Sequence, residues 1–324
     1  MKNYKKKSMS ALMQGSLGFV LLFSMLFCFS CERSTITPPI VQPVDTTTVD
    51  IPIEVKVSIK KGVGMSTNTN IGVWWKNLVN LKVHWFYTWG GFLSDAQMEN
   101  LPKNVEFVPM AWNGAAVTEA NIARWNALYE EGKINYLLGF NEPDLTDEAN
   151  MSVELAIERW TFLCERINPG IKLISPVTSY PSLTETSWMV RFMNEVEARD
   201  LRVDYIGVHI YNPPTVSNFT TPLKNVYERW GKKIWLTELG VRDDNTGGVV
   251  ANNRYTPAQM LSFTQALLPE LEAMEGIDRY AWFDSPPHFA GLWPCALIDG
   301  NGLPTIVGEY YRDLHPNEEI AEAK

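Results

Sequence analysis

Short apolar runs of strand length alternate along most of this chain with longer segments whose apolar residues recur at helical spacing. Residues 134–142 form one such run, which ends in the polar pair Asn141 and Glu142 directly before a proline. Such a run is typical of a parallel strand with both faces covered, and proline cannot donate to a sheet ladder, so we expect the strand to end at Glu142. Residues 233–239 repeat this design and carry Glu238 toward the end of their strand.

Helical patterns lie between most of the apolar runs. Residues 152–167 and 257–275 have the apolar spacing, the capping residues and the stop signals of helices, although Pro269 predicts a kink or a break in the second. The connection 94–101 is too short for a helix of ordinary length. The expected strands are residues 61–65, 83–88, 105–110, 134–142, 171–177, 203–211, 233–239 and 278–283.

Eight strands that alternate with helices over roughly 255 residues match an α/β fold of the (β/α)8 TIM barrel type in size and order. An open doubly wound sheet is the alternative for the same alternation. It would normally carry a glycine-rich phosphate-binding turn, and the sequence contains neither G-x-G-x-x-G nor G-x-x-x-x-G-K-[ST]. We therefore expect one barrel domain over residues 58–324.

The N-terminal residues 1–30 have the features of a signal peptide. Lysines near the start precede an apolar stretch that is too short for a comfortable membrane span. Ser30 then precedes Cys31, as in a bacterial lipoprotein signal whose cysteine becomes the lipidated first residue. We expect an exported lipoprotein at the outer membrane or the cell surface, which touches the membrane only through the lipid on Cys31. An ordinary cleaved signal without lipid is the alternative.

Residues 31–57 are rich in threonine and proline, and we expect them to form a flexible linker. Cys28 would leave with the signal peptide and Cys31 would carry lipid. Cys164 and Cys295 then remain in the domain, and we expect no disulfide framework from them.

Charge and histidine spacing limit the possible partners. The net charge of −9 argues against nucleic acid as a partner, because a polyanion would be repelled. The four histidines show no spacing typical of metal ligands, so we expect no metal, and no motif indicates another cofactor. We also expect a monomer.

The predicted barrel changes the interpretation of the two glutamates. Reactive groups of such barrels gather at the C-terminal ends of the strands, and strands four and seven are almost opposite each other. Glu142 and Glu238 could therefore face each other across the opening. Two carboxyl groups that flank one bond are what glycoside hydrolysis requires, since one gives a proton to the leaving oxygen and the other attacks or activates water. A lyase or an aldolase would need a lysine at a strand end or a metal cluster, and neither is apparent.

Six stretches, taken in order, carry a family resemblance. They are residues 84–90, 107–112, 138–144, 204–211, 234–238 and 279–283. Together they resemble the retaining glycosidases of clan A, and more closely glycoside hydrolase family 128, whose members are endo-β-1,3-glucanases. The resemblance spans roughly residues 61 to 315 and implies a compact barrel with shortened helices, which agrees with the short connection after the second strand.

The resemblance also implies roles for individual residues. Glu142 matches the general acid/base of the family, and Glu238 matches its nucleophile. Asn141 matches the residue that binds the sugar 2-hydroxyl beside the nucleophile. Trp282, near the end of strand eight, matches the aromatic ring that forms the floor of the subsite at the cleaved bond.

Other aromatic and polar residues near strand ends are candidates for substrate binding. His209 and Tyr211 share one face of strand six and could orient the nucleophile through hydrogen bonds. The remaining candidates are aromatic residues that could stack on sugar rings: Tyr87, Trp89, Trp112 and Trp293.

The resemblance implies a retaining endo-β-1,3-glucanase that hydrolyses β-glucan polysaccharide or oligosaccharide by double displacement. Aromatic rings contributed by several strands suit a curved β-1,3-linked chain better than a flat β-1,4-linked one. A non-catalytic β-glucan-binding surface lipoprotein on the same scaffold is the alternative. The presence of both Glu142 and Glu238 argues against it, because a pure binder need not keep both carboxyl groups.

Overall fold

The computed structural model describes residues 57–69, 71–284 and 286–323. The expected signal peptide, Cys31 and all but the last residue of the expected linker lie outside these residues. Within the part of the chain that is described, no helix is both long enough and apolar enough to cross a membrane.

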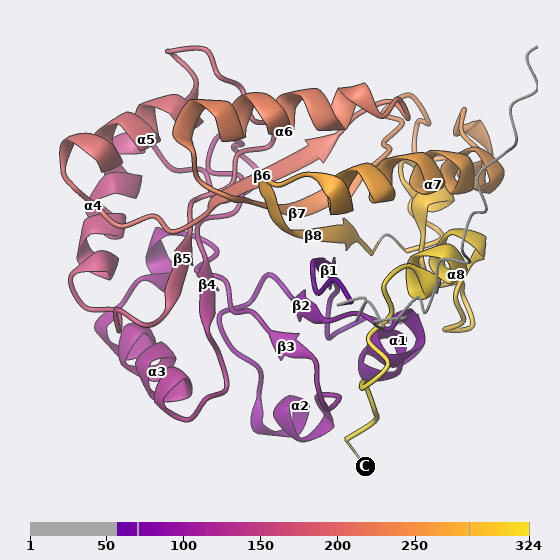
Figure 1. Ribbon diagram of the computed structural model, residues 1–324, viewed down its shortest axis with the longest axis horizontal. Coiled ribbons are helices and arrows are strands. Elements are labelled where there is room, and N and C mark those ends of the chain that lie inside the picture. Colours follow the sequence, from indigo (N-terminus) through magenta and orange to yellow (C-terminus); the bar gives the residue numbers. More distant parts are fainter. Residues whose placement is uncertain (1–56, 70, 285, 324) are drawn as a thin grey trace, which may run out of the picture. The chain divides into compact units, whose positions relative to one another are not determined.

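Eight parallel strands follow one another around a barrel in chain order (Figure 1). Six of them form one continuous ladder in the order β3-β2-β1-β8-β7-β6, and β4 pairs with β5. Bridges from Met110 to Leu138 and from Ile174 to Tyr205 join these two sheets, which closes the ring. The strands are β1 (Lys61–Gly64), β2 (Trp85–Tyr87), β3 (Glu106–Phe107), β4 (Tyr136–Leu138), β5 (Lys172–Ile174), β6 (Ile206–Tyr211), β7 (Ile234–Gly240) and β8 (Ile277–Phe283).

Helices surround the strands, and several of them are short, as the resemblance implied (Figure 1). In the short connection after β2 the chain forms a six-residue helix, which a capping box between Ser94 and Gln97 stabilises. The helices are α1 (Trp74–Leu81), α2 (Asp95–Asn100), α3 (Glu119–Glu130), α4 (Val153–Cys164), α5 (Trp188–Ala198), α6 (Ser217–Trp230), α7 (Pro257–Ala273) and α8 (Ile306–Asp313).

The break predicted at Pro269 does not occur. Helix α7 continues through this residue for its full length of 17 residues. Leu267, Leu268 and Leu271, which flank the proline, are fully buried. We infer that their packing offsets the hydrogen bond that proline removes from the helix.

Alternate residues of each strand pack into two separate apolar clusters. The larger cluster lies between the strands and the helices and includes Phe86, Leu236 and Trp282. The smaller one fills the barrel interior with side chains from five strands and from the segment after β3: Trp85, Tyr87, Val108, Met110, Leu138, Ile174, Trp235 and Ala281.

Side chains also fill the end of the barrel at which the strands begin. Arg279 lies 4.5 Å from the ring centres of both Tyr136 and Trp235, and its guanidinium forms an ion pair of 2.6 Å with Glu106. The candidate reactive groups therefore have to lie at the other end of the barrel, where the strands finish. We call this end the mouth.

Candidate active site

Glu142 lies just beyond β4, in a backbone conformation that few residues other than glycine adopt. Regular pairing of β4 ends at Leu138, and a single bridge between Asn141 and Val177 follows. Glu142 then has a φ of 44°, and its N–H donates to the carbonyl of Val177 at 2.7 Å. The strand predicted to run to Glu142 was therefore too long, because the left-handed conformation of this residue turns the chain out of the extended form.

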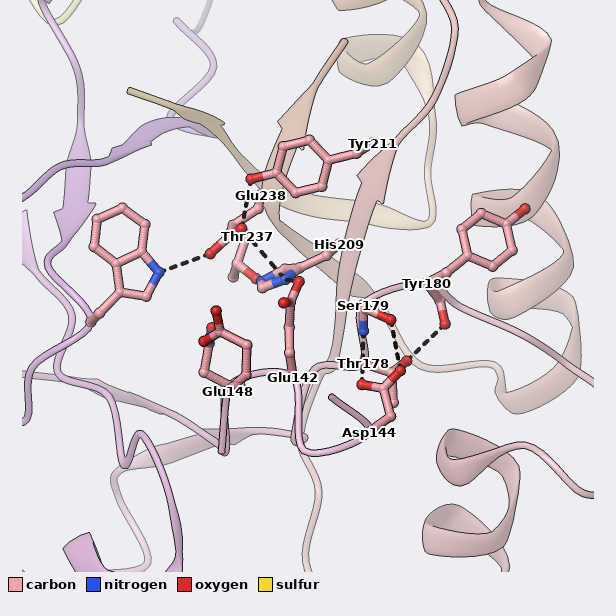
Figure 2. Close-up of polar contacts among 12 residues, drawn as sticks. Glu142, Asp144, Glu148, Thr178, Ser179, Tyr180, His209, Tyr211, Thr237 and Glu238 are labelled. Carbon is pink, nitrogen blue, oxygen red and sulfur yellow. Dashed lines mark hydrogen bonds and ion pairs between the residues drawn. The ribbon is translucent and has the colours of Figure 1, made fainter. Parts of the chain in front are cut away.

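Glu238 lies within β7 and is 5% exposed. Three donors point at its carboxylate. The hydroxyl of Tyr211 lies 2.7 Å from Oε2, and the indole N–H of Trp89 lies 2.8 Å from Oε1. The hydroxyl of Tyr87 lies 3.2 Å from Oε1 and shares its proton with the carbonyl of Thr237 at 2.9 Å. Figure 2 shows the Tyr211 bond, which fulfils the expectation that strand six orients this glutamate.

The two phenols can act only as donors to this carboxylate. Burial and the neighbouring charge of Glu238 raise the pKa of Tyr87 and of Tyr211 well above its ordinary value, so both hydroxyls stay protonated. Gly64 on β1 leaves room for the Tyr87 ring, because a Cβ at that position would lie 2.7 Å from the phenol oxygen. Trp89 has a φ of 53°, and this strained backbone conformation turns its indole toward the mouth.

His209 lies between the two glutamates and is fully buried. Its Nδ1 lies 2.9 Å from Oε1 of Glu142 and 3.6 Å from Oε2 of Glu238 (Figure 2). Burial alone lowers the pKa of His209, but the charge of Glu238 and the hydrogen bond with Glu142 outweigh it, so the net shift is upward. The sequence suggested Glu238 as the hydrogen-bond partner of His209. The bond joins His209 to Glu142, although His209 lies opposite Glu238 in the register of β6 and β7.

The three side chains Glu142, His209 and Glu238 form one cluster. Each offers one oxygen or nitrogen atom, and these atoms all lie within 4.8 Å of one another. Carboxylates and imidazole can also bind metal ions, and no spacing in the sequence indicated that His209 joins the glutamates. The expectation of no metal thus stays a prediction, which activity measured in the presence of a chelator would test.

Asn141 is 4% exposed and has a partner that the sequence did not indicate. Its side-chain Nδ2 donates to Oε2 of Glu148 at 3.1 Å. Glu148 follows the proline-containing turn after Asn141, and no periodicity marks it as part of the site. Trp112, expected as a sugar platform, is half-buried above the barrel interior, and its carbonyl accepts from the Asn141 N–H at 2.9 Å.

Trp282 does not lie at the mouth, contrary to the role that the resemblance implied. It is fully buried between β8 and the helices, and its indole donates to the carbonyl of Cys295 at 2.8 Å. The adjacent residue, Phe283, is half-buried, and its ring centre lies 5.5 Å from that of Trp89 and 5.9 Å from that of Tyr211. Successive side chains of a strand point to opposite faces, so an error of one position exchanges a core residue for a mouth residue.

Trp293 joins two loops. It begins a short 3-10 helix (Trp293–Cys295), and its indole donates to the carbonyl of Val250 at 3.0 Å. This bond connects the loop after β8 to the loop after β7. The side chain remains half-buried. Cys295, at the end of this helix, and Cys164 are free thiols.

Comparison with known proteins identifies the family. The family model described as glycosyl hydrolase catalytic core matches residues 63–311. The structure also resembles a mutant of the subgroup I endo-β-1,3-glucanase of family 128 from Amycolatopsis mediterranei, solved in complex with laminarihexaose. The two chains share 31% sequence identity with a TM-score of 0.67, and the match covers 79% of this chain and 100% of that chain. The chain belongs to glycoside hydrolase family 128.

Other members of glycoside hydrolase family 128 match over the same part of the chain. A subgroup II endo-β-1,3-glucanase from Pseudomonas viridiflava is 26% identical with a TM-score of 0.57, and the match covers 79% of this chain and 98% of that one. A subgroup III curdlan-specific exo-β-1,3-glucanase from Blastomyces gilchristii, in complex with glucose, is 24% identical with a TM-score of 0.58 over 80% of this chain and 100% of that one, which shows the fold alone. A search of curated proteins found no match.

Membership of family 128 makes the chain a glycoside hydrolase and confirms the predicted barrel. The cluster of Glu142, His209 and Glu238 lies where a barrel enzyme of this kind holds its reactive groups.

Proposed function

We propose that this glycoside hydrolase is a retaining endo-β-1,3-glucanase, with Glu142 as general acid/base and Glu238 as nucleophile. The observation that carries the proposal is the approach of the two side chains, which bring a carboxyl oxygen of each within 4.8 Å of the other at one mouth. Carboxyl groups about 5–5.5 Å apart permit direct attack on the sugar, whereas inverting enzymes need about 6.5–9.5 Å to admit a water molecule.

The hydrogen bonds support the division of roles. Glu238 accepts from three donors, which fix the orientation of its oxygens and stabilise the negative charge of an attacking carboxylate. Glu142 is half-buried and has His209 as its side-chain partner, so its other oxygen can reach the oxygen of a leaving sugar.

The reaction proposed has two steps. In the first, a Glu238 oxygen forms a bond to the anomeric carbon, the glycosidic bond breaks, and the Glu142 proton passes to the leaving oxygen. In the second, Glu142 takes a proton from water, and the oxygen of that water replaces Glu238 on the anomeric carbon. Two inversions at this carbon give net retention.

The substrate part of the proposal rests on the relatives and on the aromatic residues at the mouth. The Amycolatopsis enzyme is an endo-β-1,3-glucanase solved with laminarihexaose and with laminaritriose. In the present chain, the ring of Phe283 is inclined by 65° to Trp89 and by 76° to Tyr211. Rings inclined to one another can contact successive sugars of a curved chain, whereas a flat β-1,4-linked chain favours coplanar rings.

Product analysis tests the proposal directly. The purified domain would be incubated with linear β-1,3-, β-1,4- and β-1,6-glucans, and the products and their first-formed anomer would be followed by chromatography and proton NMR. We expect internal cleavage of the β-1,3-glucan and a β-anomer first. Cleavage of another glucan alone would contradict the substrate, and a first-formed α-anomer would contradict the double displacement.

The same assay decides between an enzyme and a surface protein that only binds β-glucan. Binding of the β-1,3-glucan without release of any product would favour the binding protein. The close approach of Glu142 and Glu238 favours the enzyme, because binding alone requires no such pair of carboxyl groups at the mouth.

A further inference from the structure

Glu148 contacts the site through Asn141 and has no part in the two steps described above. Its carboxylate Oε2 accepts from Nδ2 of Asn141 at 3.1 Å (the close-up in Figure 2 shows Glu148 beside Glu142). Burial, and next the charge of Glu142, raise the pKa of Glu148. A third acidic side chain is thus held among the groups of the mouth, although charged groups are costly to bring together.

The backbone keeps Glu148 in this position. After Glu142 the chain turns back, so that the N–H of Ala149 donates to the carbonyl of Asn141 at 3.2 Å, and the N–H of Met151 donates to the carbonyl of Pro143 at 2.9 Å. Ala149 and Met151 are buried, at 8% and 5% exposure, which anchors the returning segment in the core. The contact between Glu148 and Asn141 is therefore supported from both sides of the loop.

The chemistry of a carboxylate decides which end of the Asn141 amide faces it. An ionised carboxylate can only accept hydrogen bonds, so the NH2 group of Asn141 must face Glu148 and the carbonyl oxygen must point elsewhere. That oxygen, Oδ1, is buried and has no hydrogen-bond partner among the residues that the structure describes. A buried acceptor without a partner has lost its hydrogen bond to water without a replacement, so it indicates a place where a ligand donates.

We propose that Glu148 is a positioning residue, which holds the Asn141 amide so that Oδ1 accepts a hydrogen bond from a hydroxyl of the bound sugar. This inference rests on the proposed glucanase function. It specifies that, in the contact between Asn141 and the sugar, the sugar hydroxyl donates and the amide oxygen accepts. Without Glu148, the amide can rotate and present NH2 or oxygen with little preference, so the sugar meets a correctly oriented acceptor in only part of the molecules.

The orientation of the amide can be measured without substrate. The NH2 signals of Asn141 would be assigned in 15N–1H spectra by their absence in Asn141→Ala. We expect one NH2 proton to resonate downfield in the wild type and to lose this shift in Glu148→Ala. Asp147→Asn is the matched control, because Asp147 is an exposed acidic residue of the same loop. Asn141 signals that are the same in Glu148→Ala and in the wild type would overturn the proposal.

A double-mutant cycle tests the effect on catalysis. Glu148→Ala should lower kcat/KM on laminari-oligosaccharides roughly ten- to hundredfold, the range for loss of one hydrogen bond to a charged group, with an unchanged melting temperature. In the Asn141→Ala background the same change should have less than about a twofold effect, since Glu148 then has nothing to position. Asp147→Asn should leave kcat/KM within about twofold of the wild type.

The outcomes separate this proposal from the function on which it rests. Equal losses from Glu148→Ala in the wild type and in Asn141→Ala would show that Glu148 acts independently of the amide, and the proposal would fail while the glucanase assignment stood. A wild type that cleaves no glucan would refute the proposed function, and the NMR comparison would still decide whether Glu148 orients Asn141.

Discussion

Single side chains of the mouth differ mainly in how many donors reach them. Glu238 receives three hydrogen bonds, from Tyr211 on β6 and from Tyr87 and Trp89 on the segment that includes β2. Glu142 has a hydrogen bond with the ring of His209. This difference is the basis on which we assign attack to Glu238 and proton transfer to Glu142, and it leads to a test that separates the two roles.

Azide should rescue the two alanine variants with opposite stereochemistry. Removal of the general acid should slow hydrolysis of a glucan by roughly 10²–10⁴-fold, and removal of the nucleophile by at least as much. With an activated aryl β-glycoside, azide can enter the space left in Glu238→Ala and attack once, giving an α-glycosyl azide. In Glu142→Ala it attacks the covalent intermediate and gives the β-azide. NMR of the isolated products distinguishes them, and the reverse pattern would exchange the roles.

His209 should make stability depend on pH. Its pKa in the folded protein lies above the ordinary value of 6.5, so the folded state binds this proton more tightly than the unfolded state does. The resulting stabilisation is fully present below about pH 6.5 and is lost as pH rises through the raised folded pKa. The difference in unfolding free energy between the wild type and His209→Gln should therefore decrease from about pH 6 to about pH 9, measured by urea denaturation.

His84 provides the matched control with the opposite sign. Burial lowers the pKa of His84, despite a bond to the carbonyl of His315, so its proton binds more tightly in the unfolded state. The difference between the wild type and His84→Gln should thus increase as pH rises from the lowered folded pKa to about 6.5, and should stay level above it. Parallel pH trends for the two variants would contradict the charge environment described for His209.

At the scale of elements, the alternation of β8 decides which of its aromatic residues lie at the mouth. Tyr280 and Trp282 point toward the helices, while Ala281 and Phe283 lie on the inner face. The resemblance matched Trp282 to the aromatic ring at the floor of the subsite, but the parity of the strand assigns the mouth to Phe283.

Two truncations on β8 should separate stability from activity. Trp282→Ala should lower the unfolding free energy by about 3–5 kcal/mol, because it leaves a cavity in the core. Phe283→Ala should cost less stability, but it should lower kcat/KM on laminari-oligosaccharides severalfold, because Trp89 and Tyr211 lose the ring that packs against them. Denaturation and steady-state kinetics of both variants measure this, and a stable Trp282→Ala protein with a selective loss of activity would favour the original assignment.

At the scale of the whole molecule, the N-terminal segment leads to a prediction of where in the cell the protein is found. Cys31 lies outside the described residues, so the lipoprotein anchor is proposed from the sequence pattern alone. We expect the mature wild-type protein to partition with membranes, because lipid chains on one cysteine supply the multiple anchors that stable attachment requires.

Replacement of the lipidated cysteine should release the protein. Cys31→Ser removes the thiol that carries the lipid, so the variant should move to the soluble fraction after cell disruption and ultracentrifugation. Cys164→Ser, a change of a half-buried cysteine in the barrel, is the control and should remain with the membranes. Membrane association that persists in Cys31→Ser would favour an uncleaved signal as the anchor.

The sequence alone determined the elements of the barrel and the positions of the two glutamates at its mouth. Apolar runs and helical periodicities are local properties, so they located all eight strands and placed Glu142 and Glu238 toward the ends of two of them. Stacking candidates on β2 were also recognisable, since Trp89 follows Trp85 and Tyr87 on one face of a strand.

Only the tertiary structure decided which side chains touch. The turn at Glu142 brings its carboxyl group to His209, the parity of β8 puts Phe283 at the mouth in place of Trp282, and a returning loop brings Glu148 to Asn141. Each of these depends on a shift of one residue or on a turn whose path is set by distant contacts. Local periodicity carries no information about such shifts, because a single-residue change of register reverses the face of every side chain that follows it.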